Sequence, residues 1–164
     1  MGLINVDTLQ LQEFVEPPPY AILSHTWGPE EVTFQDMFSS KREGMRGWAK
    51  ILGSYRQAIL DDFQYAWVDT FCIDKTSSSE LSEAINSMFT WYQNSAVCYA
   101  YLEDVPPVTD EKFKSARWFT RGWCLQELIT PASVEFYTQY WTFFGTKALL
   151  SAIVTEITSI PEDA

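Results

Sequence analysis

The stretch Tyr65-Ala66-Trp67-Val68, which ends at Asp69, carries the pattern that decides the fold of this chain. It is short, apolar at every position and closed by a polar residue, which is typical of a strand buried on both faces of a sheet. The same pattern recurs at residues 20–23 and 96–102, and a fourth, shorter run, which includes Glu135, covers residues 134–137. The sequence therefore predicts four buried strands.

Helical patterns separate these runs. Apolar residues recur with a period near 3.6 in the segments 48–63, 81–92 and 113–129. Ser77 and Glu80 form a capping box before the second segment, and the third is predicted to stop near Pro131 and to break around Gly122. A last amphipathic segment covers residues 148–157. Because buried strands alternate with helices, we predict an α/β fold, a mostly parallel sheet flanked by helices on both faces.

A length of 164 residues suits a single domain, 1–164. We expect residues 1–19, which end in three prolines, to form an extended lead-in, and residues from about 20 to 160 to form the core. The N-terminus has no apolar run, so neither a signal peptide nor a membrane span is expected. The three cysteines are widely spaced and odd in number, which favours a reducing, cytoplasmic location over a disulfide framework.

The composition limits the partners. The formal net charge is −11, with only 11 basic residues. General nucleic-acid binding needs clustered Lys and Arg, so it is not expected, whereas a small anionic ligand needs only two local arginines. Aromatic residues make up 16% of the chain and include seven tryptophans, which favours a large aromatic core or a stacking pocket.

Polar residues gather where the predicted strands end, and ligands of parallel sheets bind at these carboxyl ends. The residues concerned are Ser24, His25, Asp69, Thr70, Cys72, Asp74, Glu103 and Asp104. His25 is the only histidine, and Cys72 with Asp74 lacks the paired spacing of a zinc site, so no metal site is expected.

Two enzyme classes lack their sequence signatures. Neither G-x-G-x-x-G nor the P-loop pattern occurs, which speaks against a dehydrogenase and against a P-loop ATPase. A cysteine or serine hydrolase remains an alternative, because His25, Cys72 and Asp69 have the required residue types at strand ends. No nucleophile elbow accompanies them, however, and Cys72 also suits a small apolar filler.

Glu127 is the most distinctive candidate. It is the one carboxylate in the aromatic and aliphatic stretch from Arg117 to Leu128, and helical spacing places it one turn from Trp123 on the same face. A carboxylate beside an indole is poorly solvated, so it either finds a partner or takes part in chemistry. The simpler alternative is a structural ion pair with Arg121 or Arg117.

Three blocks of sequence resemble the fungal heterokaryon incompatibility domain, or HET domain. They are residues 20–28, residues 65–75 with 83–92, and residues 117–128, and they follow the family's order over most of the chain. Phe71 is a departure, because the pattern usually carries a cysteine there. Members of the family are often longer, so the resemblance implies one module of a larger protein with nucleotide-binding or repeat domains.

The HET family is implicated in fungal self/non-self recognition that ends in cell death. It is regarded as similar to the TIR domain, a flavodoxin-like sheet whose enzymatic members hydrolyse NAD. Residues 123–128 are similar to the Trp-Cys-Leu-x-Glu-Leu helix of plant TIR domains, in which the glutamate is catalytic. The resemblance therefore implies that NAD or a related nucleotide is the substrate, that no further cofactor is needed, and that Glu127 is catalytic.

Other binding residues follow only from their places at strand ends or beside Glu127. They are Ser24, His25, Trp27, Asp69, Cys72, Asp74, Arg121 and Trp123. Trp27 or Trp123 is expected to stack on a ring of the nucleotide, and Arg121 to contact its pyrophosphate or to orient Glu127.

The resemblance also implies a homo-oligomer on activation, because a neighbouring subunit commonly completes the pocket of TIR-like enzymes. The alternative is a non-enzymatic adaptor that signals death by homotypic contacts, since a fold does not by itself decide function. An open pocket at the strand ends that contains Glu127 favours the enzyme. A salt-bridged Glu127 under a closed surface favours the adaptor.

Overall fold

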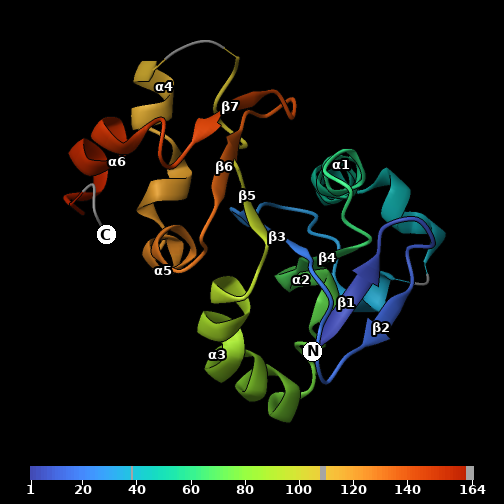
Figure 1. Ribbon diagram of the computed structural model, residues 1–164. Helices are drawn as coiled ribbons and strands as arrows, with labels where there is room; N and C mark the ends of the chain where they lie inside the picture. Colours follow the sequence, from blue (N-terminus) through green and yellow to red (C-terminus); the bar gives the residue numbers. More distant parts are fainter. Residues whose placement is uncertain (38, 108–109, 162–164) are drawn as a thin grey trace.

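The computed structural model describes residues 1–37, 39–107 and 110–161. Within these residues the chain forms a seven-stranded sheet of order β2-β1-β4-β3-β5-β6-β7 (Figure 1). The strands are β1 (Gly2–Asn5), β2 (Leu11–Glu13), β3 (Ala21–His25), β4 (Tyr65–Val68), β5 (Val97–Tyr101), β6 (Val134–Tyr137) and β7 (Phe143–Thr146).

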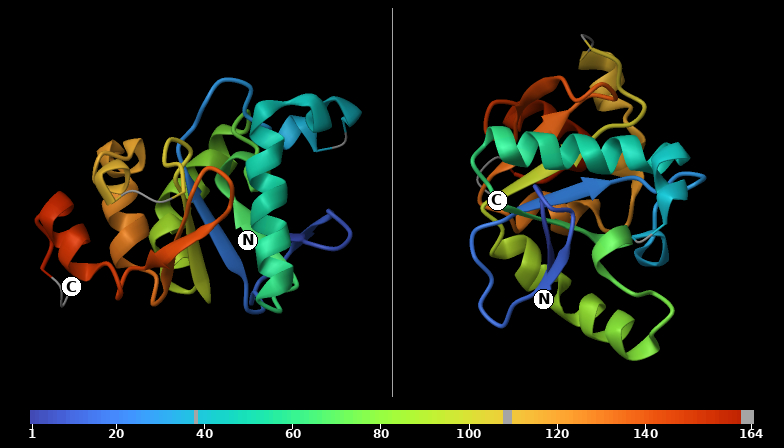
Figure 2. Two further views of the ribbon diagram at one scale, coloured as in Figure 1. Left: turned by 90° about the horizontal axis from the view of Figure 1, so that it is seen from above. Right: turned by 90° about the vertical axis from the view of Figure 1, so that its right-hand side faces the viewer.

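Helices cover both faces of this sheet. The α-helices are α1 (Arg46–Leu60), α2 (Asp69–Cys72), α3 (Ser78–Gln93), α4 (Asp110–Lys114), α5 (Cys124–Ile129) and α6 (Ser151–Thr158). Short 3₁₀-helices are η1 (Phe34–Asp36), η2 (Ser40–Gly44) and η3 (Arg117–Thr120). The strands run between α1 on one face and α3 on the other, and α5 lies on the same side as α3 (Figures 1 and 2).

The centre of the sheet is parallel, and its edges are not. Strands β4, β3, β5 and β6 pair in parallel, whereas β1 and β7 flank them in antiparallel pairing. If the four parallel strands are numbered by their order in the chain, they lie side by side in the order 2-1-3-4. The strand order of flavodoxin-like sheets, 2-1-3-4-5, starts in the same way. The predicted α/β class with a mostly parallel sheet is confirmed, and the flavodoxin-like relationship stays a prediction.

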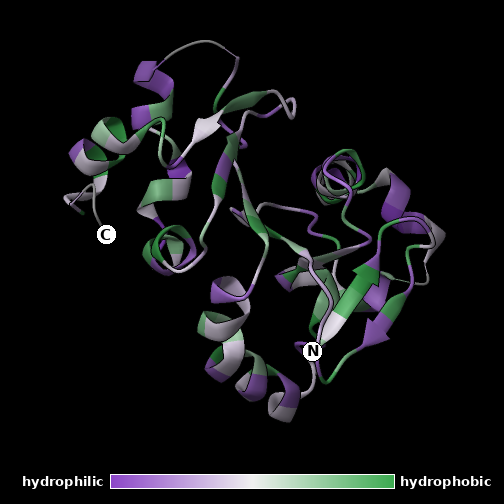
Figure 3. Ribbon diagram, in the orientation of Figure 1, coloured by the Kyte–Doolittle hydropathy of each residue, from purple (hydrophilic) through white to green (hydrophobic). Residues whose placement is uncertain are grey.

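The four predicted strands and three of the predicted helices are present. Residues 48–63, 81–92 and 148–157 correspond to α1, α3 and α6, and Ser77 is the N-cap of α3, as predicted. The predicted aromatic core is confirmed as well, because Trp67, Trp118 and several tyrosines and phenylalanines are almost fully buried. Apolar residues concentrate in the inner strands, while the helices alternate between polar and apolar (Figure 3).

Residues 1–19 differ from the predicted lead-in. They form β1 and β2, and Ile4 pairs with Ala66 of β4. Leu3 and Ile4 are fully buried, so the prediction that the core begins near residue 20 is wrong. The physical reason is the edge of β4, whose free backbone groups need partners, and β1 provides them by antiparallel pairing.

The predicted helix over 113–129 is broken into three pieces, α4, η3 and α5. The break before α5 covers residues 121–123, with an extended backbone at Arg121, which agrees with the predicted break around Gly122. Phe113 and Trp118 are both fully buried, and each packs against Phe136 of β6. In the described part of the chain, no helix is both long and apolar enough to cross a bilayer.

Gly53 of α1 makes room for Trp141, which lies in the turn between β6 and β7. A Cβ atom there would overlap the indole of Trp141, which Tyr101 and Tyr137 hold by ring contacts. We expect Gly53→Ala to lower the free energy of unfolding by about 1–3 kcal/mol, despite the better helix propensity of alanine. Gly44→Ala is the matched control, because its Cβ would meet open space. Urea unfolding measures both, and equal effects would contradict this packing argument.

Candidate functional site

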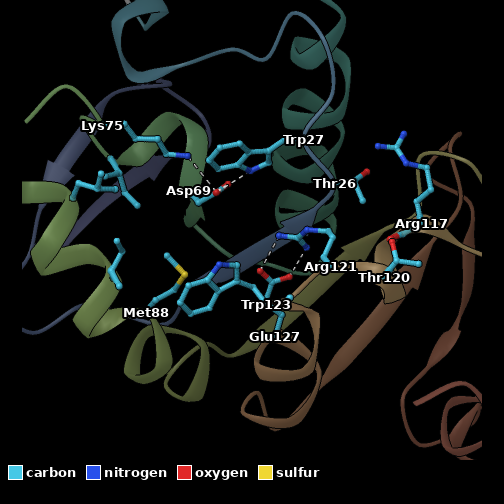
Figure 4. Close-up of a pocket in the computed structure, with 14 residues that line it drawn as sticks. Thr26, Trp27, Asp69, Lys75, Met88, Arg117, Thr120, Arg121, Trp123 and Glu127 are labelled. Atoms are coloured by element: carbon cyan, nitrogen blue, oxygen red, sulfur yellow. Dashed lines mark hydrogen bonds and ion pairs between the residues drawn. The ribbon is translucent and has the colours of Figure 1, made fainter. Parts of the chain in front are cut away.

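A cavity of about 680 Å³ opens at the carboxyl ends of β3 and β4 (Figure 4). Its volume lies in the range of pockets that hold nucleotide-sized ligands. The apolar wall consists of Trp27, Ile73, Leu81, Ile85, Met88 and Trp123. The polar side includes Thr26, Asp69, Lys75, Arg117, Arg121 and Glu127. Five of the predicted site residues therefore line one cavity: Trp27, Asp69, Arg121, Trp123 and Glu127.

Glu127 lies in the first turn of α5 with only 4% of its surface exposed. Arg121 binds it with both ends of the guanidinium, Nη1 to Oε2 at 2.7 Å and Nη2 to Oε1 at 3.1 Å. Burial opposes the charge of Arg121, but the neighbouring carboxylate outweighs it and raises the pKa of the guanidinium. Glu127 thus combines features of the two alternatives, since it forms an ion pair, as a structural glutamate would, and also lines an open cavity, as a catalytic one would.

Trp123 is the N-cap of α5, and not an interior helix residue as predicted. Its carbonyl accepts the Glu127 N–H at 3.1 Å, so the two residues remain one turn apart. The indole is 48% exposed and lines the cavity. The predicted neighbourhood of Trp123 and Glu127 therefore holds, whereas the principal partner of the carboxylate is Arg121.

A buried chain of hydrogen bonds supports Glu127 from behind. Trp118 Nε1 donates to Ser24 Oγ at 2.6 Å, and Ser24 Oγ donates to Glu127 Oε2 at 2.5 Å. An indole N–H only donates, so the Ser24 hydroxyl must accept from Trp118 and give its own hydrogen to Glu127. Ser24 is buried behind the carboxylate, outside the cavity lining. Nothing in the sequence distinguishes Trp118 from an ordinary core tryptophan.

A second cluster surrounds Asp69 at the start of α2. His25 Nε2 lies 3.0 Å from Oδ1, and Trp27 Nε1 donates to Oδ2 at 3.0 Å. Lys75 Nζ is 3.4 Å from the same Oδ2. Burial raises the pKa of Asp69, but the hydrogen bond and charge of His25, with Lys75 and Arg121, outweigh it and hold this pKa well below its usual value. Asp69 is therefore a carboxylate.

His25 supports this carboxylate without reaching the cavity. Its side chain is buried, and Nδ1 lies 3.2 Å from the carbonyl oxygen of Thr26. Both ring nitrogens thus face oxygen atoms of the protein. His25 therefore orients Asp69 and the loop after β3. It was predicted to bind the ligand directly, but it does not line this cavity.

Cys72 and Asp74 also lie outside the lining of this cavity, so its geometry gives no support to their prediction as binding residues. Cys72 Sγ accepts the Val68 N–H at 3.3 Å, and burial raises the pKa of this thiol to about 12. Asp74 accepts hydrogen bonds from the backbone and hydroxyl of Thr76 and from Gln35. Asp74 therefore stabilises a turn, and the hydrolase alternative loses its nucleophile because Cys72 is an inert, buried thiol.

The sequence did not indicate several cavity residues. Lys75 comes from the turn after α2, Arg117 from η3, and Ile85 from an apolar stripe that resembled a core face. Ile85 is nonetheless exposed and lines the cavity. Within the described residues, no group of three or more His, Cys, Asp or Glu side chains is arranged to hold a metal ion.

All three cysteines are free and buried. Burial raises the pKa of each thiol, to about 12 for Cys72 and to about 11 for Cys124. We expect native protein at pH 8 to react with a disulfide reagent in solution far more slowly than unfolded protein, in which all three thiols titrate normally. Fast labelling of a thiol in the native protein would contradict this burial.

Comparison with known families matches residues 20–108 to the family described as heterokaryon incompatibility protein (HET). Vegetative incompatibility protein HET-E-1 of Podospora anserina is 46% identical over 160 residues. The alignment covers 90% of this chain but 12% of that protein, so the chain spans about an eighth of its relative's length. No solved structure matches the chain.

Proposed function

The chain belongs to the heterokaryon incompatibility (HET) family, and on this premise we propose that it serves fungal self/non-self recognition as a cell-death effector. Its proposed activity is the hydrolysis of NAD, or a related nucleotide, to nicotinamide and ADP-ribose. The observation that carries this proposal is Glu127, a carboxylate in the lining of a cavity of about 680 Å³ between two half-exposed tryptophans. We place the active form in the cytoplasm, as an oligomer.

The cavity suits a dinucleotide in size and chemistry. Trp27 and Trp123 are 52% and 48% exposed, so each offers an indole face to a flat ring. Arg117 and Arg121 line the same cavity and suit the two phosphates, because a guanidinium binds phosphate oxygens in pairs. NAD enters as the substrate in this proposal, and no further cofactor is needed.

In the proposed reaction, the bond between ribose C1′ and the nicotinamide nitrogen breaks. The nitrogen keeps the electron pair, so the positively charged ring leaves as neutral nicotinamide and the positive charge moves to the ribose. The Glu127 carboxylate stabilises this oxocarbenium-like state by its negative charge. Water then adds to C1′ and releases a proton, giving ADP-ribose. A single carboxylate suffices, since the leaving group needs no protonation.

Arg121 has two tasks in this scheme. In the free protein it neutralises Glu127 through both guanidinium nitrogens. When a pyrophosphate enters, Arg121 turns toward it, and the carboxylate becomes free to face the ribose. Ser24 keeps its hydrogen bond to Oε2 throughout and thereby holds the carboxylate in place.

A non-enzymatic adaptor is the second candidate function, and two observations favour it. Both oxygens of Glu127 already have partners. In addition, Ile85 and Phe89 of α3 and Leu125 and Ile129 of α5 are large apolar side chains exposed to solvent. Homotypic assembly through such a surface needs no open carboxylate.

Nicotinamide release separates the two functions. We would measure it with NAD for the purified domain over a range of protein concentrations, and for a fusion to an oligomerising domain. The enzyme proposal expects release, with turnover per protomer rising as the protein assembles. If the concentrated fusion releases none, the adaptor function is favoured. Equal turnover per protomer at all concentrations would contradict the requirement for assembly and leave the catalytic proposal intact.

A further inference from the structure

Lys75 lies against the exposed indole of Trp27. Its ammonium nitrogen is 3.4 Å from the centroid of the Trp27 ring and 3.4 Å from Asp69 Oδ2 (Figure 4). The same Asp69 oxygen accepts the Trp27 indole N–H at 3.0 Å, which fixes the ring beside the carboxylate. An aromatic face and a carboxylate thus converge on one cation, the arrangement by which proteins recognise organic cations.

The contact of Lys75 is easily exchanged, while the turn that carries it is fixed. Asp74 accepts hydrogen bonds from Gln35 Nε2 at 2.6 Å and from the backbone of Thr76 at 2.9 Å, which holds the backbone on either side of Lys75. The Lys75 side chain itself is 28% exposed and ends on a flexible four-carbon stem. Its ammonium can therefore swing into solvent without any change in the turn.

We propose that Trp27 and Asp69 form a subsite for a planar aromatic cation of the N-alkylpyridinium class, and that Lys75 occupies this subsite in the free protein until the ligand displaces it. For the natural ligand this inference rests on the proposed function, because the nicotinamide ring of NAD is such a cation. In this arrangement the nicotinamide ring stacks on Trp27. Trp123 and the apolar side chains of α3 then contact the other end of the nucleotide.

Charge balance explains why the ligand should be positive. Asp69 is a mostly buried carboxylate, and Lys75 supplies part of its neutralisation. A cationic ring that displaces Lys75 replaces the lost positive charge, whereas a neutral ring leaves the carboxylate less compensated. After bond cleavage the nicotinamide is neutral, so it loses this advantage and Lys75 returns. The subsite therefore favours substrate binding and product release together.

Two small probes of nearly equal size test the subsite without turnover. They are 1-methylnicotinamide, which is positively charged, and N-methylnicotinamide, which carries the methyl group on the amide and is neutral. We would titrate each into the full chain by calorimetry. Lys75→Met should bind the charged probe about fivefold more tightly than the wild type and the neutral probe with a much smaller gain, because neither probe then has to displace Lys75 but only the charged one neutralises Asp69. Lys41→Met removes a charge from an exposed site elsewhere and should change neither affinity.

A double variant shows whether the gain arises at the Trp27 face. Trp27 is half exposed, so Trp27→Leu is compatible with folding. In Trp27→Leu/Lys75→Met the gain for the charged probe should disappear relative to Trp27→Leu alone. A gain that persists there, an equal gain for both probes, or no gain in Lys75→Met would overturn the subsite. Selective binding of the charged probe without NAD cleavage would sustain the subsite and refute the enzyme, whereas cleavage without this selectivity would refute only the subsite.

Discussion

Glu127→Gln is expected to reduce nicotinamide release from NAD by about a hundredfold or more, the usual cost of removing a group that stabilises charge in a transition state. Glutamine keeps the shape of the side chain and an oxygen that accepts from Ser24, but it carries no negative charge for the ribose cation. Release would be measured with the oligomerised protein, under the conditions in which the wild type turns over.

The control for this variant is Glu83→Gln on the exposed side of α3, which removes an equal charge away from the cavity. Glu127→Gln leaves Arg121 without its anionic partner, so thermal unfolding must accompany the assay. Binding of 1-methylnicotinamide at Trp27 reports whether the cavity remains formed. Wild-type turnover in a folded Glu127→Gln protein would refute the catalytic role.

Lys50→Met is expected to give the largest loss of stability, about 3–5 kcal/mol of the free energy of unfolding, because it leaves a carboxylate buried without its counter-charge. Lys50 projects from α1, is buried, and forms an ion pair with Glu31. Its ammonium also donates to the Thr26 carbonyl at 2.9 Å, and Glu31 Oε1 accepts the Gly28 N–H at 2.7 Å. Lys50 thereby holds the loop that carries Trp27.

Urea unfolding would measure this loss, and the double variant Lys50→Met/Glu31→Gln provides the matched comparison. Removing both charges should restore part of the stability, since the buried anion is then absent. Lys41→Met, at an exposed position, should stay within about 0.5 kcal/mol of the wild type. If Lys50→Met is as stable as Lys41→Met, the ion pair does not hold the loop.

The sequence by itself determined the central strands, the longer helices and the α/β class. The reason is local: a run such as residues 65–68 is apolar at every position, so only burial on both faces satisfies it. Glu127 also stood out locally, as a single carboxylate in an aromatic stretch. Of the residues that share its cavity, Asp69 and Trp27 were predicted from their places after strands, and Arg121 and Trp123 from their places beside Glu127.

Only the tertiary structure decided which residues support these groups. Ser24 lies 103 residues from Glu127 and 94 from Trp118, and the three meet because β3 is central in the sheet and both η3 and α5 bring a side chain to its end. The role of β1 and the places of Cys72 and Lys75 were likewise hidden. These features depend on strand order, free strand edges and the burial of distant side chains, which are properties of the assembled chain and leave no periodic signal in its sequence.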